Sequence, residues 1–429
     1  MKLVLYTLFF LSSLTAVAQD DIYPAKKQEG VIVINNGTIH TGKGAVIQKG
    51  TIVIRDGKIQ KVSEQPETIS GATVIDASGK NVYPGLILPS TDLGLREIGS
   101  GVRGSNDYYE LGEYNTDVRA IVAYNTDSRI INTLRANGIL LANVMPNGRF
   151  LAGSSSVVQL DAWTWEDALY KADNGMVLNL PELIKPLRSY GPAPATDPVK
   201  EGMKKIEALK SFFAEAKAYA NAPSKQETNL KFEALRPLFE KKQKLFVTAD
   251  ISRQILMAID LAKRFDINVV IVGGSDSYLL ADLLKQNNIP VILNALHALP
   301  TLEDDAIDQP FKTPAILKKA GVLFALNDDF AEARYRNLAF LAGTASSYGL
   351  SKEEALQAIT ADAARILGIE ERTGSIEAGK DANIIIASGD ILDMDKSIVT
   401  DAFIQGRKIN LANKQTQLYE RYKEKYKLQ

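Results

Sequence analysis

The stretch LFVTADISRQILMAIDLAKRFDINVVIVGG (residues 245–274) decides the fold class of this 429-residue chain. Two apolar runs of strand length, 245–249 and 267–274, enclose a segment (251–265) in which apolar residues recur at helical spacing. The order strand, helix, strand predicts two parallel strands that are joined by a crossover helix.

The same alternation continues on both sides of this stretch. A helical segment at 277–286, then PVILN, TPAILKKAG and LFALND follow it, while GILLANV, SSVVQLD and GMVLNLP precede it with weaker helical segments between them. A Lys- and Glu-rich stretch (198–241) predicts long amphipathic helices. About eight strands between residues 86 and 373 fit a (β/α)8 TIM-like barrel. On periodicity alone, a doubly wound open sheet is the alternative.

The two ends of the chain have a different pattern. Residues 31–85 contain short β-rich runs separated by Asn-Gly, Asp-Gly and Ser-Gly dipeptides, which form tight turns because Asn, Asp and Gly tolerate positive φ. Residues 374–412 are also β-rich, with Gly at the turns. Neither segment is large enough to bury a core alone. We therefore expect them to form one discontinuous β-sandwich domain beside the barrel (86–373), followed by a charged helical tail (413–429).

The first 18 residues have the pattern of a secretory signal peptide. Lys2 precedes an apolar run of about 16 residues that ends in Ala-Val-Ala, a cleavage pattern for residue 18. The alternative, a spanning helix, needs about 20 apolar residues. We expect an exported protein, periplasmic or extracellular, with no membrane anchor. A net charge of −1 without a dominant basic patch argues against a nucleic-acid partner.

Three long motifs resemble the amidohydrolase superfamily, and especially its imidazolonepropionase-like branch. They are the opening NNGTIHTGKG…GTIVIRDGKIQKV…VIDASGKNVYPGLI, the central VTADISRQILMAIDLAKRFDINVVIVGGSDSY and the closing LSKEEALQAITADAARILGIEERTGSIEAGKDANIIIASGD. The similarity covers nearly the whole chain after the signal segment. It implies a barrel hydrolase that uses a divalent metal, usually zinc, to attack C–N bonds other than peptide bonds in small or cyclic amides.

The departures from this family fall on the metal ligands, because most of the ligand histidines are replaced. The chain has only two histidines and no cysteine, whereas zinc sites are built mainly from imidazole and thiolate. The resemblance places the degenerate ligand positions at Ser90 and Asp92 on strand one, Thr248 on strand five, Gly273-Gly274 on strand six and Asp328 on strand eight. Two carboxylates and two hydroxyls leave open a weak all-oxygen site for Mg²⁺ or Ca²⁺. We assign no cofactor beyond this resemblance.

Two residues are candidates for the chemistry that remains. Asp328 follows the last barrel strand, so it is a possible general base or the cap of the next helix. His297 follows the seventh strand and is a weaker candidate, since a structural hydrogen bond explains a single loop histidine better than a catalytic role does. His40 lies in the β-rich segment, and we expect no catalytic role for it.

The segment after strand one (96–128) should lie on the functional face of the barrel. It carries arginines and tyrosines that can hold an anionic or sugar-like ligand, or that simply cover the barrel. These residues are Arg96, Arg103, Tyr108, Tyr109 and Arg119.

Three functions follow from these observations. The first is a family member with low or lost activity that acts as a homo-oligomer or beside an active relative. The second is a true hydrolase of small amides with an unusual oxygen-ligand site. The third is an exported binding protein that uses the barrel mouth as a receptor for a small molecule. The sequence does not identify the ligand-binding residues.

Overall fold

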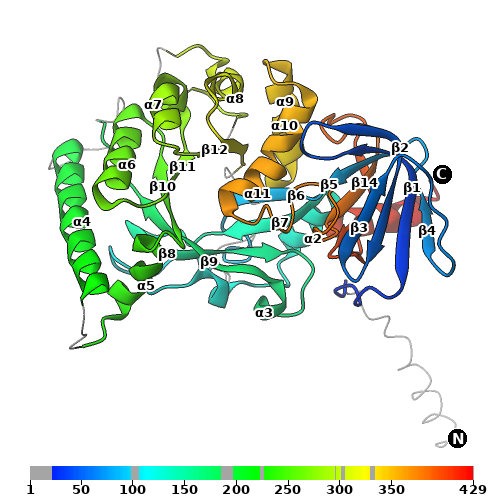
Figure 1. Ribbon diagram of the computed structural model, residues 1–429, viewed down its shortest axis with the longest axis horizontal. Coiled ribbons are helices and arrows are strands. Elements are labelled where there is room, and N and C mark those ends of the chain that lie inside the picture. The colour runs from blue at the N-terminus through cyan, green and yellow to red at the C-terminus, as the bar shows by residue number, and fades with distance from the viewer. Residues whose placement is uncertain are drawn as a thin grey trace, which may run out of the picture.

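The computed structural model of the chain describes residues 22–97, 106–184, 197–222, 227–294, 296–300, 305–328 and 334–428. The predicted signal peptide (1–18) and Arg103 lie outside these residues. The described chain forms an eight-stranded barrel and a second eight-stranded β-sheet that stands beside it (Figure 1). This arrangement confirms the predicted barrel with a separate sheet domain.

The barrel strands follow one another in the order of the sequence, whereas a doubly wound sheet changes direction at a switch point. Their side chains are mostly buried, as is typical of strands covered on both faces. The strands are β6 (Leu86–Thr91), β7 (Ile139–Val144), β8 (Leu151–Gln159), β9 (Leu169–Asn179), β10 (Lys244–Ala249), β11 (Val269–Gly273), β12 (Val291–Leu293) and β13 (Phe324–Leu326).

One barrel strand runs against the others. Strand β8 is antiparallel to both β7 and β9, while the remaining neighbours are parallel. Only residues 145–150 connect β7 to β8, and a parallel crossover needs a dozen residues or more. The short connection therefore forces β8 to turn back along β7, which is a departure from the regular alternation that the sequence predicts.

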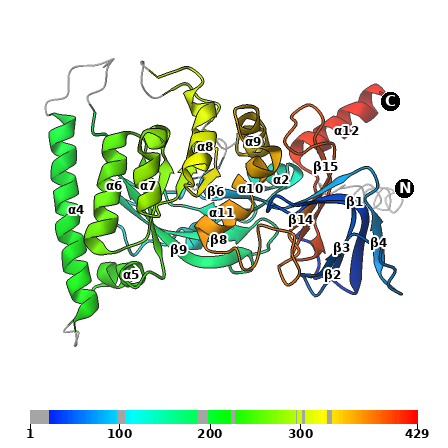
Figure 2. The same cartoon turned by 45° about the horizontal axis from the view of Figure 1, so that its top comes forward.

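Helices cover the outside of the barrel on the side of the parallel strands (Figures 1 and 2). The long helix α4 lies at the edge of the molecule that is farthest from the sheet. The helices of the barrel are α2 (Arg129–Ala136), α3 (Trp165–Ala168), α4 (Pro198–Asn221), α5 (Leu230–Phe239), α6 (Ser252–Phe265), α7 (Ala281–Gln286), α8 (Gln309–Ala320), α9 (Leu338–Ser347), α10 (Lys352–Ala358) and α11 (Ala361–Leu367), with 3-10 turns η2 (Ala120–Ala123), η3 (Ser275–Leu280) and η4 (Tyr335–Asn337).

Local sequence sets where these helices begin and end. Helix α4 begins after Asp197, whose carboxylate accepts a hydrogen bond from the Val199 amide at 3.0 Å, with Pro198 at the first position. Helix α6 ends at Asp266, which takes the left-handed conformation with φ of 56°. Its buried positions, among them Ile255, Ile259 and Phe265, recur at helical spacing and face the barrel.

The second unit is a sheet built from both ends of the chain. Strand β14 from the C-terminal segment pairs with β5 from the N-terminal segment, in antiparallel register from Ile384 with Pro84 to Ala387 with Asn81. The sheet strands are β1 (Val31–His40), β2 (Val46–Arg55), β3 (Lys58–Ser63), β4 (Thr73–Asp76), β5 (Asn81–Pro84), β14 (Ile384–Ser388), β15 (Ile398–Ile404) and β16 (Arg407–Lys408). A separate apolar core, made largely of isoleucine, lies within this unit.

A carboxylate on this unit has a strongly perturbed acidity. Glu377 lies between Lys43 and Lys380 and accepts a hydrogen bond from Ser375 at 2.5 Å. Burial favours the neutral acid, but the hydrogen bonds from Lys43, Ser375 and Lys380 outweigh it and lower the pKa of Glu377 to about 2. The contact between Lys43 and Glu377 joins the N-terminal segment to the C-terminal one.

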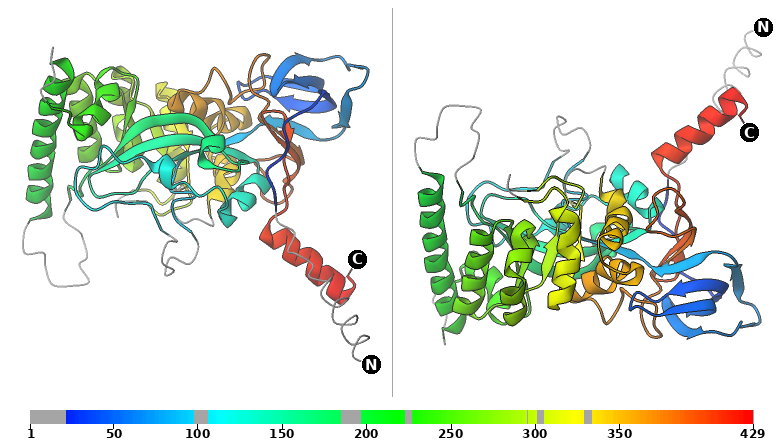
Figure 3. Two further views of the ribbon diagram at one scale, coloured as in Figure 1. Left: turned by 90° about the horizontal axis from the view of Figure 1, so that it is seen from below. Right: turned by 90° about the horizontal axis from the view of Figure 1, so that it is seen from above.

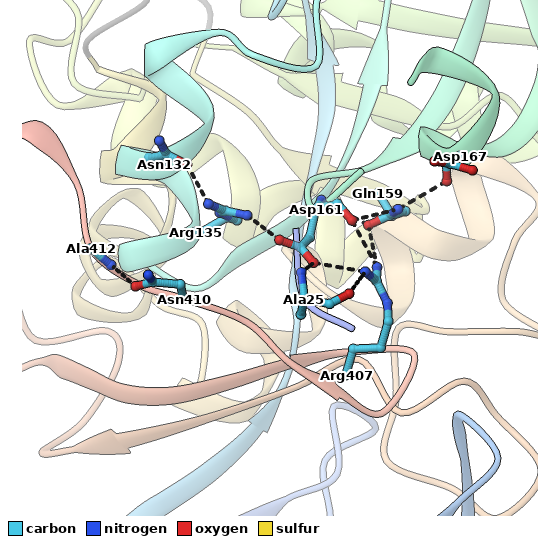
Figure 4. A network of polar contacts seen from close by, with 9 residues as sticks. All are labelled: Ala25, Asn132, Arg135, Gln159, Asp161, Asp167, Arg407, Asn410 and Ala412. Atoms are coloured by element: carbon cyan, nitrogen blue, oxygen red, sulfur yellow. Dashed lines mark hydrogen bonds and ion pairs between the residues drawn. The ribbon is translucent and has the colours of Figure 1, made fainter. Parts of the chain in front are cut away.

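A buried ionic network fastens the barrel to the sheet and to the start of the described chain (Figure 4). Asp161, directly after β8, contacts Arg135 of α2 and lies 2.9 Å from Nη1 of Arg407 on β16. Its Oδ2 atom also accepts a hydrogen bond from the Ala25 amide at 2.9 Å. Because the Asp161 side chain is fully buried, these three partners replace its hydration.

The last helix, α12 (Lys414–Tyr426), projects away from the body of the molecule (Figure 3). Asn413 caps it by accepting a hydrogen bond from the Thr416 amide at 2.9 Å, and none of its residues is buried. Across the described residues, no helix is both long and apolar enough to cross a lipid bilayer.

Candidate functional site

A cavity of about 260 Å³ opens at the carboxyl ends of the barrel strands. Active sites of barrels with this architecture lie at this end. Its deeper wall is apolar and includes Met145, Val177, Phe246 and Val272, while its upper wall carries amide, hydroxyl and charged groups. The polar lining residues are Ser90, Thr91, Asp92, Arg96, Asn147, Asn179, Thr248, Asn294 and Tyr335.

The end of the first barrel strand contributes Ser90 and Asp92 to this cavity. The Ser90 hydroxyl lies 3.4 Å from the Met145 thioether, which is a weak acceptor. Asp92 accepts a hydrogen bond from the Tyr335 hydroxyl at 2.6 Å, and its other oxygen is 3.7 Å from Arg96. The carboxylate at this predicted ligand position therefore already has a phenol and a guanidinium as partners.

An asparagine side chain bridges the two outermost strands of the barrel. Asn327, directly after β13, is fully buried and accepts a hydrogen bond from the Ser90 amide at 3.1 Å. Its own amide group donates to Asn294 at 2.9 Å. Among the described residues, β6 and β13 form no backbone ladder. The side chain of Asn327 thus supplies a polar link where the barrel is nearly closed.

On the opposite side of the mouth, two strand ends are joined in the same way. Thr248 at the end of β10 donates a hydrogen bond to Asn179 at the end of β9, over 2.8 Å. Asn179 in turn donates to the Gly148 carbonyl at 2.9 Å. The predicted ligand position Thr248 does line the mouth, and its hydroxyl already has an acceptor.

The end of the sixth barrel strand has no room for a side chain. Gly273 has φ of 106°, a conformation that L-residues rarely adopt, and a Cβ atom there would lie 2.6 Å from Oδ1 of Asp250. Asp250 is held in place because Ser275 donates its hydroxyl to the same oxygen at 2.8 Å. A histidine at this position would require both the backbone and Asp250 to move.

Asp328 and His297 lie apart from the lining of the cavity. Asp328 is fully buried, and its carboxylate is 3.5 Å from Nε of Arg334. His297 is 2.7 Å from the Thr344 hydroxyl, which itself donates to the Phe340 carbonyl at 3.1 Å, so the Nε2–H group of His297 is the donor. Partial burial and then the Arg334 charge lower the pKa of His297, against the opposing effect of Asp328.

The donor set of the mouth does not fit the metal that the family resemblance implies. Asp92 is the one carboxylate among the described lining residues, and no histidine lines the cavity. Within the described ranges, no three His, Cys, Asp or Glu side chains come together as a metal site requires. Zinc needs three protein ligands, usually imidazole, thiolate or carboxylate. Neutral amides and hydroxyls predominate instead.

Four residues that shape the mouth were not predicted from the sequence. Asn179 is the last residue of β9, while Asn294 and Asn327 directly follow β12 and β13, so the runs GMVLN, PVILN and LFALN each close on asparagine. That repetition was visible in the sequence. Tyr335, by contrast, lies on η4 with no pattern to mark it. His40 lies in the sheet, 2.6 Å from Glu353 and stacked on Tyr83.

Among its described residues, the segment after strand one contributes one charged residue to the mouth. Arg96 lines the cavity, and its guanidinium lies 5.6 Å from the ring centre of Tyr108. Arg119 instead forms an ion pair with Asp173 at 2.9 Å. Tyr109 packs edge-on against Tyr108 with ring centres 5.0 Å apart. The structure therefore brings Arg96, but neither Arg119 nor Tyr109, to the cavity lining.

Comparisons with known proteins show which family the chain resembles. The family model described as "Amidohydrolase family" matches residues 259–409. The imidazolonepropionase of Thermoplasma volcanium is 34% identical over 121 residues, 28% of this chain and 30% of that protein. The imidazolonepropionase of Picrophilus torridus is 31% identical over 199 residues, 44% of this chain and 48% of that protein. These matches thus span less than half of either relative.

A solved structure extends the similarity over most of the chain. The crystal structure of an amidohydrolase from Thermotoga maritima superimposes with a TM-score of 0.76 at 26% sequence identity. The superposition covers 88% of this chain and 99% of that one. Barrel, sheet unit and their connection are therefore shared with that protein.

Proposed function

Because this chain belongs to the amidohydrolase superfamily, in its imidazolonepropionase-like branch, we propose that its barrel mouth binds a small amide-like molecule without zinc-dependent hydrolysis. The observation that carries this proposal is the set of neutral hydrogen-bonding groups at the strand ends. Ser90 and Thr248 stand where the family resemblance places metal ligands, and asparagine side chains lie beside them. Amide and hydroxyl groups match the donors and acceptors of a cyclic amide or ureide.

The chemistry of the family explains why hydrolysis should be weak or lost. Bound zinc lowers the pKa of water from about 15.7 to about 7, which makes hydroxide available at neutral pH. A lone general base contributes only about 10²–10⁴-fold. Asp92 already accepts a hydrogen bond from the Tyr335 hydroxyl, and Asp328 does not line the cavity. The lining groups therefore orient a ligand rather than activate water.

The similarity to a solved amidohydrolase along nearly the whole chain favours a second candidate, a hydrolase with an oxygen-ligand centre. Asp92 would be its carboxylate ligand, together with hydroxyl and amide oxygens that suit Mg²⁺ better than zinc. Metal content separates the two candidate functions, because only the oxygen-ligand hydrolase requires a bound ion for turnover.

The decisive experiment uses the full chain after gentle purification from its native host. We expect elemental analysis to give zinc and magnesium well below stoichiometric amounts, and calorimetry to detect hydantoin binding without turnover. Thr248→Val should weaken hydantoin binding, whereas Thr400→Val on β15 in the sheet should leave it unchanged. Stoichiometric metal together with hydantoin hydrolysis would refute the proposal and support the second candidate.

We further propose that the protein is exported and acts in the periplasm or outside the cell, alone or as a complex. The support is the sequence of residues 1–18, which has the charge, apolar run and cleavage pattern of a signal peptide. N-terminal sequencing of the protein from a periplasmic fraction should begin at residue 19. Cross-linking in the same fraction would show whether it forms oligomers or accompanies an active relative.

A further inference from the structure

A second described cavity, a groove of about 460 Å³, has a different lining from the barrel mouth and includes a residue of η4. It lies between the barrel helices α2 and α9, strand β15 of the sheet and the first turn of α12. Most of its lining is apolar and includes Phe340, Ile391, Val399 and Leu411. Hence it is a pocket between the two units of the protein.

One charged side chain faces this apolar groove. Arg336 of η4 lines it, and no acidic residue is among the described lining residues. In the part of the chain that the structure describes, Arg336 has no ion-pair partner and no hydrogen bond. An arginine carries five N–H donors and stays charged at all accessible pH values. The groove therefore combines an apolar wall with an exposed cation that has no protein partner among the described residues.

Three of the other four polar side chains at the groove, all but Ser397, are already bonded within their own elements. Asn137 donates to the Thr133 carbonyl at 2.8 Å. Asn413 and Thr416 bond to each other in the cap of α12, at 2.9 and 3.0 Å. A ligand would therefore find its polar anchor at Arg336 and meet mainly carbon elsewhere.

We propose that this groove binds a small anionic amphiphile, a free single-chain carboxylate of the fatty-acid type. Its carboxylate would accept two parallel hydrogen bonds from Arg336, and its alkyl chain would lie against Phe340, Val399 and Leu411. The charge of Arg336 selects an anion, and the apolar wall selects a hydrocarbon body. The neighbouring residue on η4, Tyr335, lines the barrel mouth, so a single turn separates the two cavities.

Calorimetry of the full chain with hexanoate, octanoate and decanoate below their micelle-forming concentrations tests this proposal. We expect decanoate to bind at one site, with affinity rising by up to about fourfold for each methylene buried. Methyl decanoate, which has the same chain without the charge, should bind at least about tenfold more weakly, because the charge-assisted bonds are lost.

Two variants locate the site. Arg336→Gln should weaken decanoate binding by about tenfold or more, while Arg421→Gln, on the exposed part of α12, should leave it unchanged. Ala136→Trp, which fills the groove from the end of α2, should also reduce binding. Equal affinity of decanoate for the parent chain and Arg336→Gln, equal binding of the methyl ester, or no binding of decanoate at all would each overturn the proposal.

Discussion

Replacing Asp161 by asparagine should destabilise the protein severely, although the two side chains have nearly the same shape. The carboxylate is fully buried and is the shared counter-charge of Arg135 and Arg407, whose side chains are 4% and 15% exposed. An asparagine would turn its NH₂ group toward one of these guanidinium groups, so that two donors would face each other. The variant therefore isolates the loss of one buried charge.

The magnitude follows from the contacts. Asp161 makes charge-assisted contacts with two arginines and accepts a bond from the Ala25 amide. Removing one partner of a buried ionic group costs about 3–5 kcal/mol, because the remaining charge is left without compensation. Burial already lowers the pKa of Arg135 while Asp161 opposes that shift, so desolvation at this site is substantial. The expected loss is at least a fifth of a typical unfolding free energy of about 5–15 kcal/mol.

Equilibrium unfolding in urea measures this loss by two probes. Trp163 and Trp165 flank the network and report on it by fluorescence, while far-ultraviolet circular dichroism reports on the whole chain. Asp173→Asn is the matched control, because its ion pair with Arg119 is 39% and 44% exposed. Such a pair contributes at most about 1 kcal/mol.

Two results would refute the reasoning. If the unfolding free energy of Asp161→Asn falls by less than about 1 kcal/mol, the substitution does not leave an uncompensated buried charge. If Asp161→Asn and Asp173→Asn lose the same amount, burial is not what distinguishes them. Transitions that separate between the two probes would instead show that the sheet and the barrel unfold independently.

Three further predictions concern other parts of the molecule. Gly273→Ala should cost about 1–3 kcal/mol of unfolding free energy, because the new side chain adds backbone strain at positive φ to a clash with the nearby carboxylate of the β10–α6 loop. Gly79→Ala is the control, since Gly79 also has positive φ but nothing within 4 Å, and it should cost less in the same urea titration. Asn327→Leu should cost about 1–3 kcal/mol in thermal or urea unfolding, because the buried Ser90 amide loses its acceptor. The pKa of Glu377 is lowered to about 2, so its contribution to the free energy of unfolding is complete above its ordinary pKa and is lost as pH falls toward 2. Glu377→Gln should reduce the pH dependence of the unfolding free energy in that window by less than about 1 kcal/mol, since the side chain is 41% exposed. An acid unfolding profile identical to that of the parent chain would contradict this.

The antiparallel strand β8 shows where periodicity was insufficient. The runs that became β7, β8 and β9 were recognised as strands, because apolar and β-branched residues are concentrated there. Their direction depends on the length of the connection, and the residues 145–150 are too few for a crossover. The direction of β8 could therefore be predicted from the number of residues between β7 and β8, but not from the residue types within the strands.

The candidate site likewise contains residues that the sequence placed correctly and residues that it did not. The motif around residues 84–92 marked Ser90 and Asp92, and VTAD marked Thr248; all three line the mouth. Asp328 and His297 were placed near the mouth because they follow strands, but neither lines the cavity. A residue after a strand can turn inward or outward, and only the packing of neighbouring loops decides which.

By itself, the sequence determined the alternation of strands and helices, the two-part origin of the sheet and the shortage of imidazole ligands. These features depend on local periodicity, turn chemistry and residue type. The tertiary structure alone decided that Asn327 bridges the outer barrel strands, that Asp161 serves two arginines from distant segments, and that Arg336 faces an apolar groove. Such contacts join residues that are far apart in the chain, and their energies depend on burial and distance, which no local pattern encodes.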